Sequence, residues 1–348
     1  MGARMIRRFI CVFIILILTL PATIALGEPE VDKTDQIRLT FVGDILLDGY
    51  VGDQIAKFGV NYPFEKVAPK LKQADMAFAN LETPVSTKGK PVDNKTFVFR
   101  SKPTALAGLV YAGVDGVTVA NNHILDYGKD AMLDTIVQLN KYKIGYTGAG
   151  KNIKEAFSPY VKTIKDKKIA VLGVSRVLSG PSWYAGEKNA GAASAYTLEP
   201  LLTEIKKSTQ ENDFTIVYLH WNEEFKDYPE PYARKLAKQM IDSGADMIIG
   251  AHSHCLMGIE YYQHKPIYYS LGNFVFNRST RGGDKTLDSM IVDFEIKGSK
   301  ITSKITPVKI IHGQPNFMPE AYNKKTIKLL NKLSYNAKID AHGNVTEK

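Results

Sequence analysis

Cysteine is the residue type that this sequence lacks most clearly. Of its 348 residues only Cys11 and Cys255 are cysteines, and Cys11 lies inside an apolar amino-terminal segment. The rest of the chain therefore has no pair of cysteines that could form an intramolecular disulfide. Its stability must come from a hydrophobic core or from bound metal, and the length suits one large domain or two smaller ones.

Signals for two common classes of ligand are also missing. The glycine-containing loop at residues 145–150 lacks the Lys-Ser/Thr of a phosphate-binding loop, so that kind of nucleoside-triphosphate site is excluded. Arginine and lysine do not cluster with interleaved aromatic residues, and no nucleic-acid partner is predicted. The chain shows no internal repeat, and no segment after Gln36 is long enough to divide it into independent domains.

The amino terminus has the layout of an export signal. Three arginines within residues 4–8 precede an apolar run over residues 9–20. We interpret residues 1–27 as a signal peptide or, if uncleaved, as an N-terminal membrane anchor. Residues 28–36 then form a linker. The folded part is expected to be exported, either secreted or held at the outer face of the cytoplasmic membrane.

Positive charge exceeds negative charge in this chain. The formal net charge is +9, and about +6 is left once residues 1–27 are removed. This balance favours anionic partners such as phosphate esters or polyanionic polymers, although a basic, solvated surface is the more common explanation.

Short apolar runs alternate with helical patterns, which predicts an α/β (α+β) fold. Strands are expected at residues 37–42, 76–79, 117–120, 169–174, 214–219, 247–249 and 266–271. Helices are expected at residues 64–73, 104–112, 127–141, 198–210, 231–242 and 321–335, with a hairpin over residues 290–311 and a frayed last dozen residues.

Polar side chains follow at least five of these strands. They are Asp44, Glu82, Asn122 with His123, His220, and His252 with His254. Ligands bind at the carboxyl edge of open α/β sheets, so one shared site explains this placement more simply than independent loop residues. Carboxylate, amide oxygen and imidazole together suit one or two divalent ions of Mn, Fe or Zn.

Other polar residues have more than one interpretation. Asp126 is expected to cap the helix that begins near Tyr127 rather than to orient His123. Asn273 either supports the metal site or satisfies a turn. Arg100 and Lys102 are candidate contacts for an anionic substrate, although surface solvation is the better explanation.

Three further features are weaker functional candidates. Trp183 and Trp221 are expected to pack in the core, and the long loop at residues 179–195 is a candidate substrate flap. Glu223 and Glu224 are adjacent on a loop, and adjacent carboxylates rarely aim at one glycosidic bond.

Six motifs in order resemble those of the poly-γ-glutamate capsule biosynthesis protein (CapA) family, which itself resembles the calcineurin-like metallophosphoesterases. The motifs are Gly43-Asp44, Asn80-Leu-Glu82, Ala120-Asn-Asn-His-Ile-Leu-Asp126, His220-Trp221, Gly250-Ala-His-Ser-His254 and Ser270-Leu-Gly-Asn-Phe274. The resemblance implies a four-layer αββα sandwich of two mixed sheets over residues 37–315, with residues 316–348 as a C-terminal helix and tail. It also implies a two-metal site on the loops of one edge.

The resemblance assigns a role to each motif residue. It implies that Asn122, His220 and His252 bind one ion, that Asp44 and His254 bind the other, and that Glu82 lies between the two ions. His123 falls at the place of a non-ligand histidine that assists the leaving oxygen, and Arg100 and Asn121 are the candidate substrate-binding residues. Two departures stand out, because Leu46 replaces a usual imidazole and Glu82 replaces a usual aspartate.

Two functions fit these residues. The first is an extracytoplasmic metal-dependent hydrolase of a phosphate ester or a related anionic bond, with His123 as general acid. The second is a non-catalytic component that binds or exports the anionic capsule polymer. In both cases the expected partners are an anionic polymer or a phosphate-bearing substrate, together with membrane proteins of capsule synthesis.

Overall fold

The structure is a computed structural model, which describes residues 36–277, 279 and 281–348. The segment interpreted as a signal peptide or anchor, residues 1–27, lies outside the described residues, and so does nearly all of the linker. None of the helices within the described part has the length and hydrophobicity needed to span a bilayer.

The larger sheet is mixed. Within the described residues it has ten strands, which are β1 (Ile37–Ile45), β2 (Met76–Leu81), β3 (Gly116–Thr118), β4 (Gly145–Thr147), β13 (Asn273–Val275), β14 (Asp288–Lys297), β15 (Lys300–Ile311), β16 (Gln314–Phe317), β17 (Ala337–Ile339) and β18 (Asn344–Glu347). Their order is β17-β18-β15-β14-β1-β2-β3-β4, with β13 beside β1 and β16 beside β15. Strands β1 to β4 run parallel, and β14 and β15 are antiparallel to their neighbours.

The smaller sheet carries the histidine motifs. In the described part its six strands are β6 (Tyr160–Ile164), β7 (Lys167–Ser175), β9 (Phe214–His220), β10 (Met247–Ala251), β11 (Ile259–Tyr262) and β12 (Lys265–Tyr268). Their order is β11-β12-β10-β9-β7-β6, and β7, β9, β10 and β12 are parallel. A separate pair joins β5 (Ala149–Gly150) to β8 (Gly191–Ala192).

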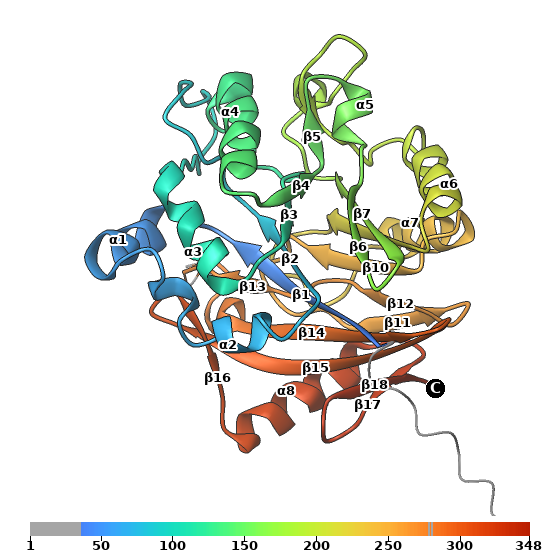
Figure 1. Cartoon of the computed structure of the whole chain (residues 1–348). Coiled ribbons are helices and arrows are strands. Elements are labelled where there is room, and N and C mark those ends of the chain that lie inside the picture. Colours follow the sequence, from blue (N-terminus) through green and yellow to red (C-terminus); the bar gives the residue numbers. More distant parts are fainter. Residues whose placement is uncertain (1–35, 278, 280) are drawn as a thin grey trace, which may run out of the picture. The chain divides into compact units, whose positions relative to one another are not determined.

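Helices cover the outer faces of the two sheets (Figure 1). The helices are α1 (Gly49–Phe58), α2 (Ala68–Leu71), α3 (Leu106–Ala112), α4 (Gly128–Lys141), α5 (Ile153–Ala156), α6 (Leu201–Glu211), α7 (Pro231–Asp242) and α8 (Glu320–Leu333). Helices α3 and α4 pack in the core on the larger sheet, and α6 and α7 pack in the core on the smaller one.

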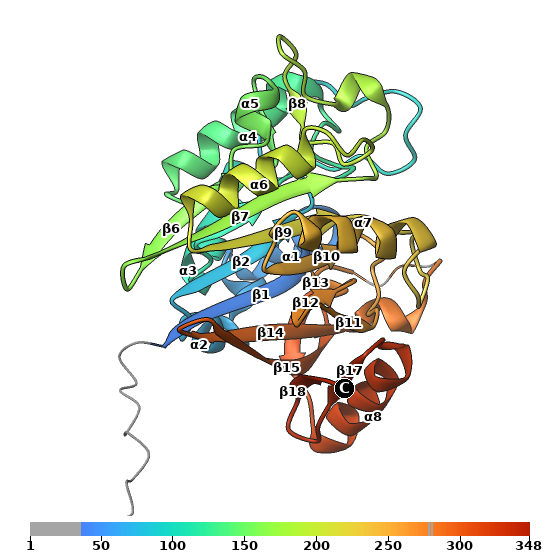
Figure 2. The same ribbon diagram turned by 90° about the vertical axis from the view of Figure 1, so that its right-hand side faces the viewer.

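The two sheets face each other across a third core. Phe41, Phe78, Tyr218 and Phe294 meet there, with ring centroids between 5.9 and 6.3 Å apart for the pairs that involve Phe41. Buried apolar side chains on the inner faces of both sheets make this arrangement favourable. The expected four-layer αββα fold is therefore confirmed, and Figure 2 shows helices α6 and α7 in front of the strands of the smaller sheet.

Two local expectations are wrong. Helix α1 is not anticipated from the sequence, because Gly49 and Gly52 weaken its helical pattern even though Val51 and Ile55 are spaced to share one face. The last dozen residues are not frayed, since β17 and β18 pair with each other and β18 pairs with β15. Their few apolar residues become a buried face only when β15 lies beside them.

The long loop at residues 179–195 packs against the rest of the domain. Its tryptophan, Trp183, is buried, and Trp221 is buried with its ring nitrogen donating to the carbonyl of Tyr269 at 2.9 Å. Both tryptophans pack, as expected. The role of this loop as a flap stays a prediction.

Candidate metal centre

The carboxyl ends of strands from both sheets bring the predicted ligands together. Asp44 lies in β1 and Glu82 directly follows β2, whereas His220 ends β9 and His252 directly follows β10. The parallel register of β9 and β10 places His220 beside Ala251. All four side chains are almost entirely buried.

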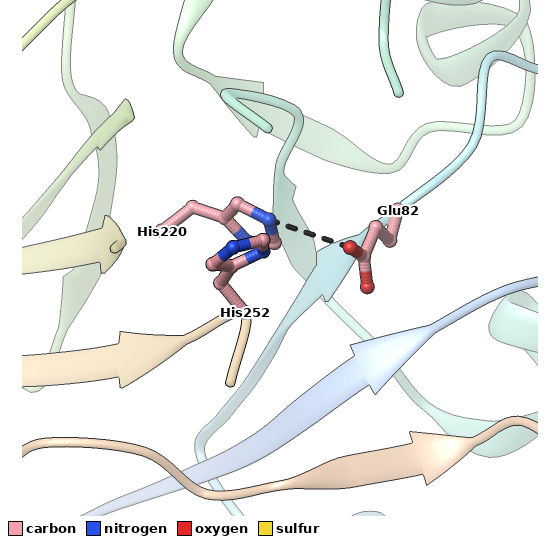
Figure 3. A group of neighbouring side chains, drawn as sticks. All are labelled: Glu82, His220 and His252. Carbon is pink, nitrogen blue, oxygen red and sulfur yellow. Dashed lines mark ion pairs between the residues drawn. The ribbon is translucent and has the colours of Figure 1, made fainter. Parts of the chain in front are cut away.

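These residues form two groups of possible ligands that share one carboxylate. Glu82, His220 and His252 make one group, and Asp44, Glu82 and His254 make the other; within each group the ligand atoms lie within 4.8 Å of one another. Figure 3 shows the rings of His220 and His252 side by side and facing Glu82. Glu82 therefore lies where the resemblance implies a residue between two ions.

Unsatisfied polar atoms test whether a cation fits. Within the described part of the chain, neither carboxylate oxygen of Glu82 has a hydrogen-bond partner, and neither does Nδ1 of His252. A buried carboxylate without partners is costly, so such groups are normally paired or bind metal. Although Nε2 of His220 lies 3.3 Å from Glu82 Oε1, the contact is not a hydrogen bond. The donor set fits a divalent cation.

The spacing of the donor atoms agrees with this conclusion. Nε2 of His220 lies 3.3 Å from Glu82 Oε1 and 2.9 Å from Asn122 Oδ1. Two ligand atoms that each lie about 2.1 Å from one ion, at roughly 90–110° to each other, are about 3.0–3.4 Å apart. The separation of His220 and Glu82 thus fits two ligands of a single ion, and the shorter contact between His220 and Asn122 is a hydrogen bond.

Burial keeps the imidazoles in their ligand form. Desolvation lowers the pKa of His220 to about 3 and lowers that of His252 well below its ordinary value. Burial, followed by the charge of Glu82, raises the pKa of Asp44 to about 6. Neutral imidazole is the form that binds metal, and a cation among these carboxylates would offset their mutual repulsion.

His254 differs from the other two histidines. Burial lowers its pKa, but the charges of Glu82 and Asp44 outweigh burial, so the net shift is upward. Its Nδ1 lies 2.9 Å from Oδ1 of Asn273, which in turn donates from Nδ2 to the carbonyl of Thr286. Asn273 therefore contacts His254, one of the candidate ligands, and also bonds to the backbone, so its role in supporting a metal site stays a prediction.

The backbone of the His-x-His segment is strained. His252 has φ of 95° and His254 has φ of 57°, a region that non-glycine residues seldom adopt. The backbone nitrogen of His252 donates to Oδ2 of Asp44 at 3.2 Å. Strain of this kind persists where function requires a particular geometry.

Asn80 is a site residue that the sequence analysis did not assign. Its Nδ2 donates to Oδ1 of Asp44 at 2.8 Å and lies 3.1 Å from Nδ1 of His220, and its Oδ1 accepts from Asn121. The available signal was its spacing, because residues two apart on a strand point to the same face, and Asn80 stands two residues before Glu82.

His123 is held by Asp126, and the capping prediction is wrong. Nδ1 of His123 lies 2.7 Å from Oδ2 of Asp126, whose Oδ2 also accepts from the backbone nitrogen of Phe99. Helix α4 begins at Gly128 without a side-chain cap. Burial of Asp126 beneath the loop explains the difference, since a buried carboxylate needs partners of its own.

Lys95 is a second residue that the sequence analysis missed. Its ammonium contacts the Asp126 carboxylate and the carbonyl oxygen of Asn122, and it lies 3.2 Å from Nδ1 of His123. Lys95 comes from the polar loop after β2, where nothing in the sequence separates it from the surface lysines around it. It completes a Lys-Asp-His arrangement beside the metal ligands.

The predicted substrate-binding residues have partners inside the protein. Asn121 is buried, with its Nδ2 donating to the carbonyl of Leu81 at 2.8 Å. The guanidinium of Arg100 lies over the ring of Tyr127 at 4.1 Å and donates to the carbonyl of Lys88. Their contact with a substrate stays a prediction.

Glu223 and Glu224 each pair with a different cation. Glu223 lies 3.5 Å from Lys226, and Glu224 lies 3.1 Å from Arg281. This separate pairing gives no support to a glycosidase acid pair.

The family comparison agrees with the motif resemblance. A family model described as Bacterial capsule synthesis protein PGA_cap matches residues 38–278. The Capsule biosynthesis protein CapA of Bacillus anthracis is 30% identical, covering 90% of this chain and 80% of that protein. The PGA biosynthesis protein CapA of Bacillus subtilis (strain 168) is 31% identical, covering 83% of this chain and 77% of that protein.

A solved structure is similar only at a distance. The NAD nucleotidase of Haemophilus influenzae (NadN) is 12% identical with a TM-score of 0.46, covering 88% of this chain and 57% of that one.

Proposed function

Because the chain belongs to the family of bacterial capsule synthesis proteins, we propose that it is a capsule biosynthesis protein whose metal centre hydrolyses a phosphate ester or a related anionic bond. The names of its relatives support a role in capsule and PGA biosynthesis. The site supports the chemistry, which those names do not specify.

One observation carries the proposal. Glu82 belongs to both groups of possible ligands, and neither of its buried oxygens has a hydrogen-bond partner. A carboxylate in that state suits a position between two cations. Two-metal sites of this kind are common among phosphatases and nucleases.

The proposed mechanism assigns each residue a task. Glu82, Asn122, His220 and His252 would hold one ion, and Asp44, His254 and Glu82 would hold the other. A bound Mn, Fe or Zn ion neutralises the anionic group and makes water a nucleophile near neutral pH.

His123 would act on the leaving oxygen. Its Nδ1 faces Asp126, so the hydrogen bond fixes the tautomer and orientation of the ring. In the imidazolium form, which the hydrogen bond to Asp126 favours, Nε2 carries the proton that goes to the leaving oxygen, while Lys95 holds Asp126 in place.

Turnover measurements on the metal-loaded protein test this function. Phosphomonoesters, phosphodiesters and poly-γ-glutamate would be assayed with the wild type, His123→Ala and a control, His264→Ala, whose side chain is 91% exposed. We expect His123→Ala to keep its metal and to lose roughly 10²–10⁴-fold in kcat, the usual scale of general acid catalysis. Unchanged turnover in His123→Ala would contradict the mechanism.

Leu46 favours a second candidate function. It stands where the metallophosphoesterase resemblance implies an imidazole, and its apolar side chain lies beside His254 in the lining of one pocket. A non-catalytic component that binds or exports the polymer would need the fold and the metal but no general acid. No turnover on any substrate, together with measurable binding of poly-γ-glutamate, would favour this alternative.

We also propose that the protein acts outside the cytoplasm. The basic and apolar pattern of residues 1–27 supports export. Protease added to spheroplasts should digest the folded domain, and protection from external protease would contradict export.

A further inference from the structure

A pocket beside the metal centre has an apolar wall that the metal chemistry does not use. Its volume is about 300 Å³, and its lining includes His123 and His254, so it opens directly onto the site. Four phenylalanines contribute to the same lining, namely Phe97, Phe99, Phe225 and Phe276. We call this cavity the phenylalanine pocket.

The four rings are placed around the two histidines. Phe99 lies 4.9 Å from the ring of His123 between centroids, and Phe97 stacks on Phe99 at 6.4 Å. On the other side, Phe276 lies 5.0 Å and Phe225 5.9 Å from the ring of His254. The pocket thus begins at the residue proposed to protonate the leaving oxygen.

These rings are not core side chains. Phe97 is 55% exposed, and the other three phenylalanines are only partly buried. Four neighbouring phenylalanines that keep part of their surface in contact with water are typical of a binding site, because apolar surface is otherwise buried in folding.

The charges in the lining of the phenylalanine pocket do not favour a polyanionic ligand. Asp48 accepts from the backbone nitrogen of Arg100, and Glu224 pairs with Arg281. Among the residues that the structure describes, the lining has two carboxylates and one guanidinium. A second pocket of about 340 Å³ beside His252 contains Glu223, Glu224 and Glu230. Neither cavity complements a polymer that has a carboxylate on every residue.

We propose that the phenylalanine pocket binds the uncharged, apolar alcohol part of a small phosphate ester whose phosphate lies at the metal centre. This inference rests on the proposed hydrolase function and names its substrate class. Hydrolysis breaks the phosphorus–oxygen bond, the hydroxyl of water goes to phosphorus, and the alcohol oxygen takes a proton from His123. The proton that water releases returns His123 to its protonated form, so the overall reaction consumes one water. The apolar alcohol is then the product that leaves through the pocket.

Phosphonates test the pocket without requiring turnover, since their carbon–phosphorus bond is not hydrolysed. Phenylphosphonate and methylphosphonate would be titrated by calorimetry into the manganese-loaded full-length protein. We expect phenylphosphonate to bind roughly ten- to a hundredfold more tightly, the range for burying one phenyl-sized group. Phe97→Ala and Phe276→Ala should each reduce this ratio by roughly threefold or more.

The matched control is Phe58→Ala. Phe58 is 51% exposed and lies on α1, outside the pocket lining, so its removal deletes a comparable exposed ring and should leave the ratio unchanged. Equal affinity for the two phosphonates, no binding of either, or an equal loss in Phe58→Ala would overturn the proposal.

Turnover of phenyl phosphate and methyl phosphate separates this proposal from the hydrolase function. A phenyl preference in binding without turnover of either ester supports the pocket and overturns the hydrolase. Equal turnover of both esters with equal phosphonate affinities supports the hydrolase and overturns the pocket. Hexylphosphonate distinguishes the kinds of apolar group. Binding as tight as that of phenylphosphonate indicates that the pocket takes a flexible hydrocarbon chain, and weaker binding indicates that it takes a flat ring. Either result supports an apolar ligand.

Discussion

Glu82 and Glu260 are both buried glutamates, but they differ in their partners. Glu260 accepts from Nε and Nη2 of Arg234, both at 2.9 Å, and from the hydroxyl of Tyr269 at 2.7 Å. Glu82 has no hydrogen-bond partner on either oxygen among the residues that the structure describes. A carboxylate that supports the fold comes with its own donors, whereas one that binds a ligand keeps its lone pairs available.

Substitutions around Glu260 and around Glu82 should therefore affect the stability of the protein in different ways. Changes at Glu260 should alter stability with or without metal. Changes at Glu82 and its neighbours should alter stability mainly through metal. The following predictions test this difference, beginning with the largest effect.

Removing the partner of Glu260 should destabilise the fold. Arg234→Met leaves a buried carboxylate without its main cation, so we expect the free energy of unfolding to fall by about 3 kcal/mol, near the lower limit for breaking a buried pair. The lower limit applies because the Arg234 side chain is 36% exposed. Urea denaturation measures this loss, and metal content should not change.

The control for this variant is Lys238→Met, whose ammonium lies 3.5 Å from the same carboxylate and whose side chain is 39% exposed. This substitution should lower the free energy of unfolding by less than about 1 kcal/mol. Desolvation raises the pKa of Glu260, but the hydrogen bonds from Arg234 and Tyr269 outweigh it and the net shift is downward. The stabilisation is thus fully present above pH 4.5, the ordinary pKa of the group, and is lost as the pH falls below it. A loss in Lys238→Met equal to that in Arg234→Met would contradict this account.

Removing a ligand at the other site should abolish stabilisation by metal. At a concentration of manganese about 100 times Kd, the wild type should gain about 2.7 kcal/mol. His252→Ala should lose most of this gain, and its metal content by elemental analysis should fall. Asp44→Ala should mainly weaken a second ion, and a wild type that binds no metal after reconstitution with manganese or zinc would refute the site.

Glu82→Gln should change stability in opposite directions in the metal-free and the metal-loaded protein. Without metal, removal of a buried charge that lacks partners should stabilise the protein by about 1–2 kcal/mol. With metal, the variant should gain little from the ion. Thermal unfolding with and without a chelator measures both effects, and a metal-free variant less stable than the wild type would show that Glu82 supports the fold as Glu260 does.

Lys95→Met should have the smallest effect on catalysis, and it should also destabilise the fold because it leaves the buried carboxylate of Asp126 without its cation. Loss of the cation that holds Asp126 should reduce kcat roughly tenfold, or about 1.4 kcal/mol, with metal content unchanged. Lys95→Arg should restore part of the activity, and Lys90→Met, an exposed lysine on the same loop, should have no effect. An equal loss in Lys90→Met would indicate a general effect of surface charge.

Much of the site could be predicted because strand order along the chain places the ligands. Asp44, Glu82, His220 and His252 each stand at or just beyond the end of an apolar run, and the carboxyl ends of parallel strands meet at one edge. Asn80 was recognisable from its place in a motif and from its spacing two residues before Glu82. Lys95 was not recognisable at all, because its loop folds over the site through tertiary contacts.

The sequence by itself determined the alternation of strands and helices, the polar residues at the strand ends and the resemblance to the capsule family, since these depend on local patterns along the chain. Only the tertiary structure decided that Asp126 holds His123 rather than capping α4, that β17 and β18 extend the larger sheet, and that four phenylalanines gather beside the metal centre. The physical reason is that burial and the choice of hydrogen-bond partners depend on residues far apart in the sequence. Asp126, for example, takes its partners from Lys95, Phe99 and His123 once the loop covers it.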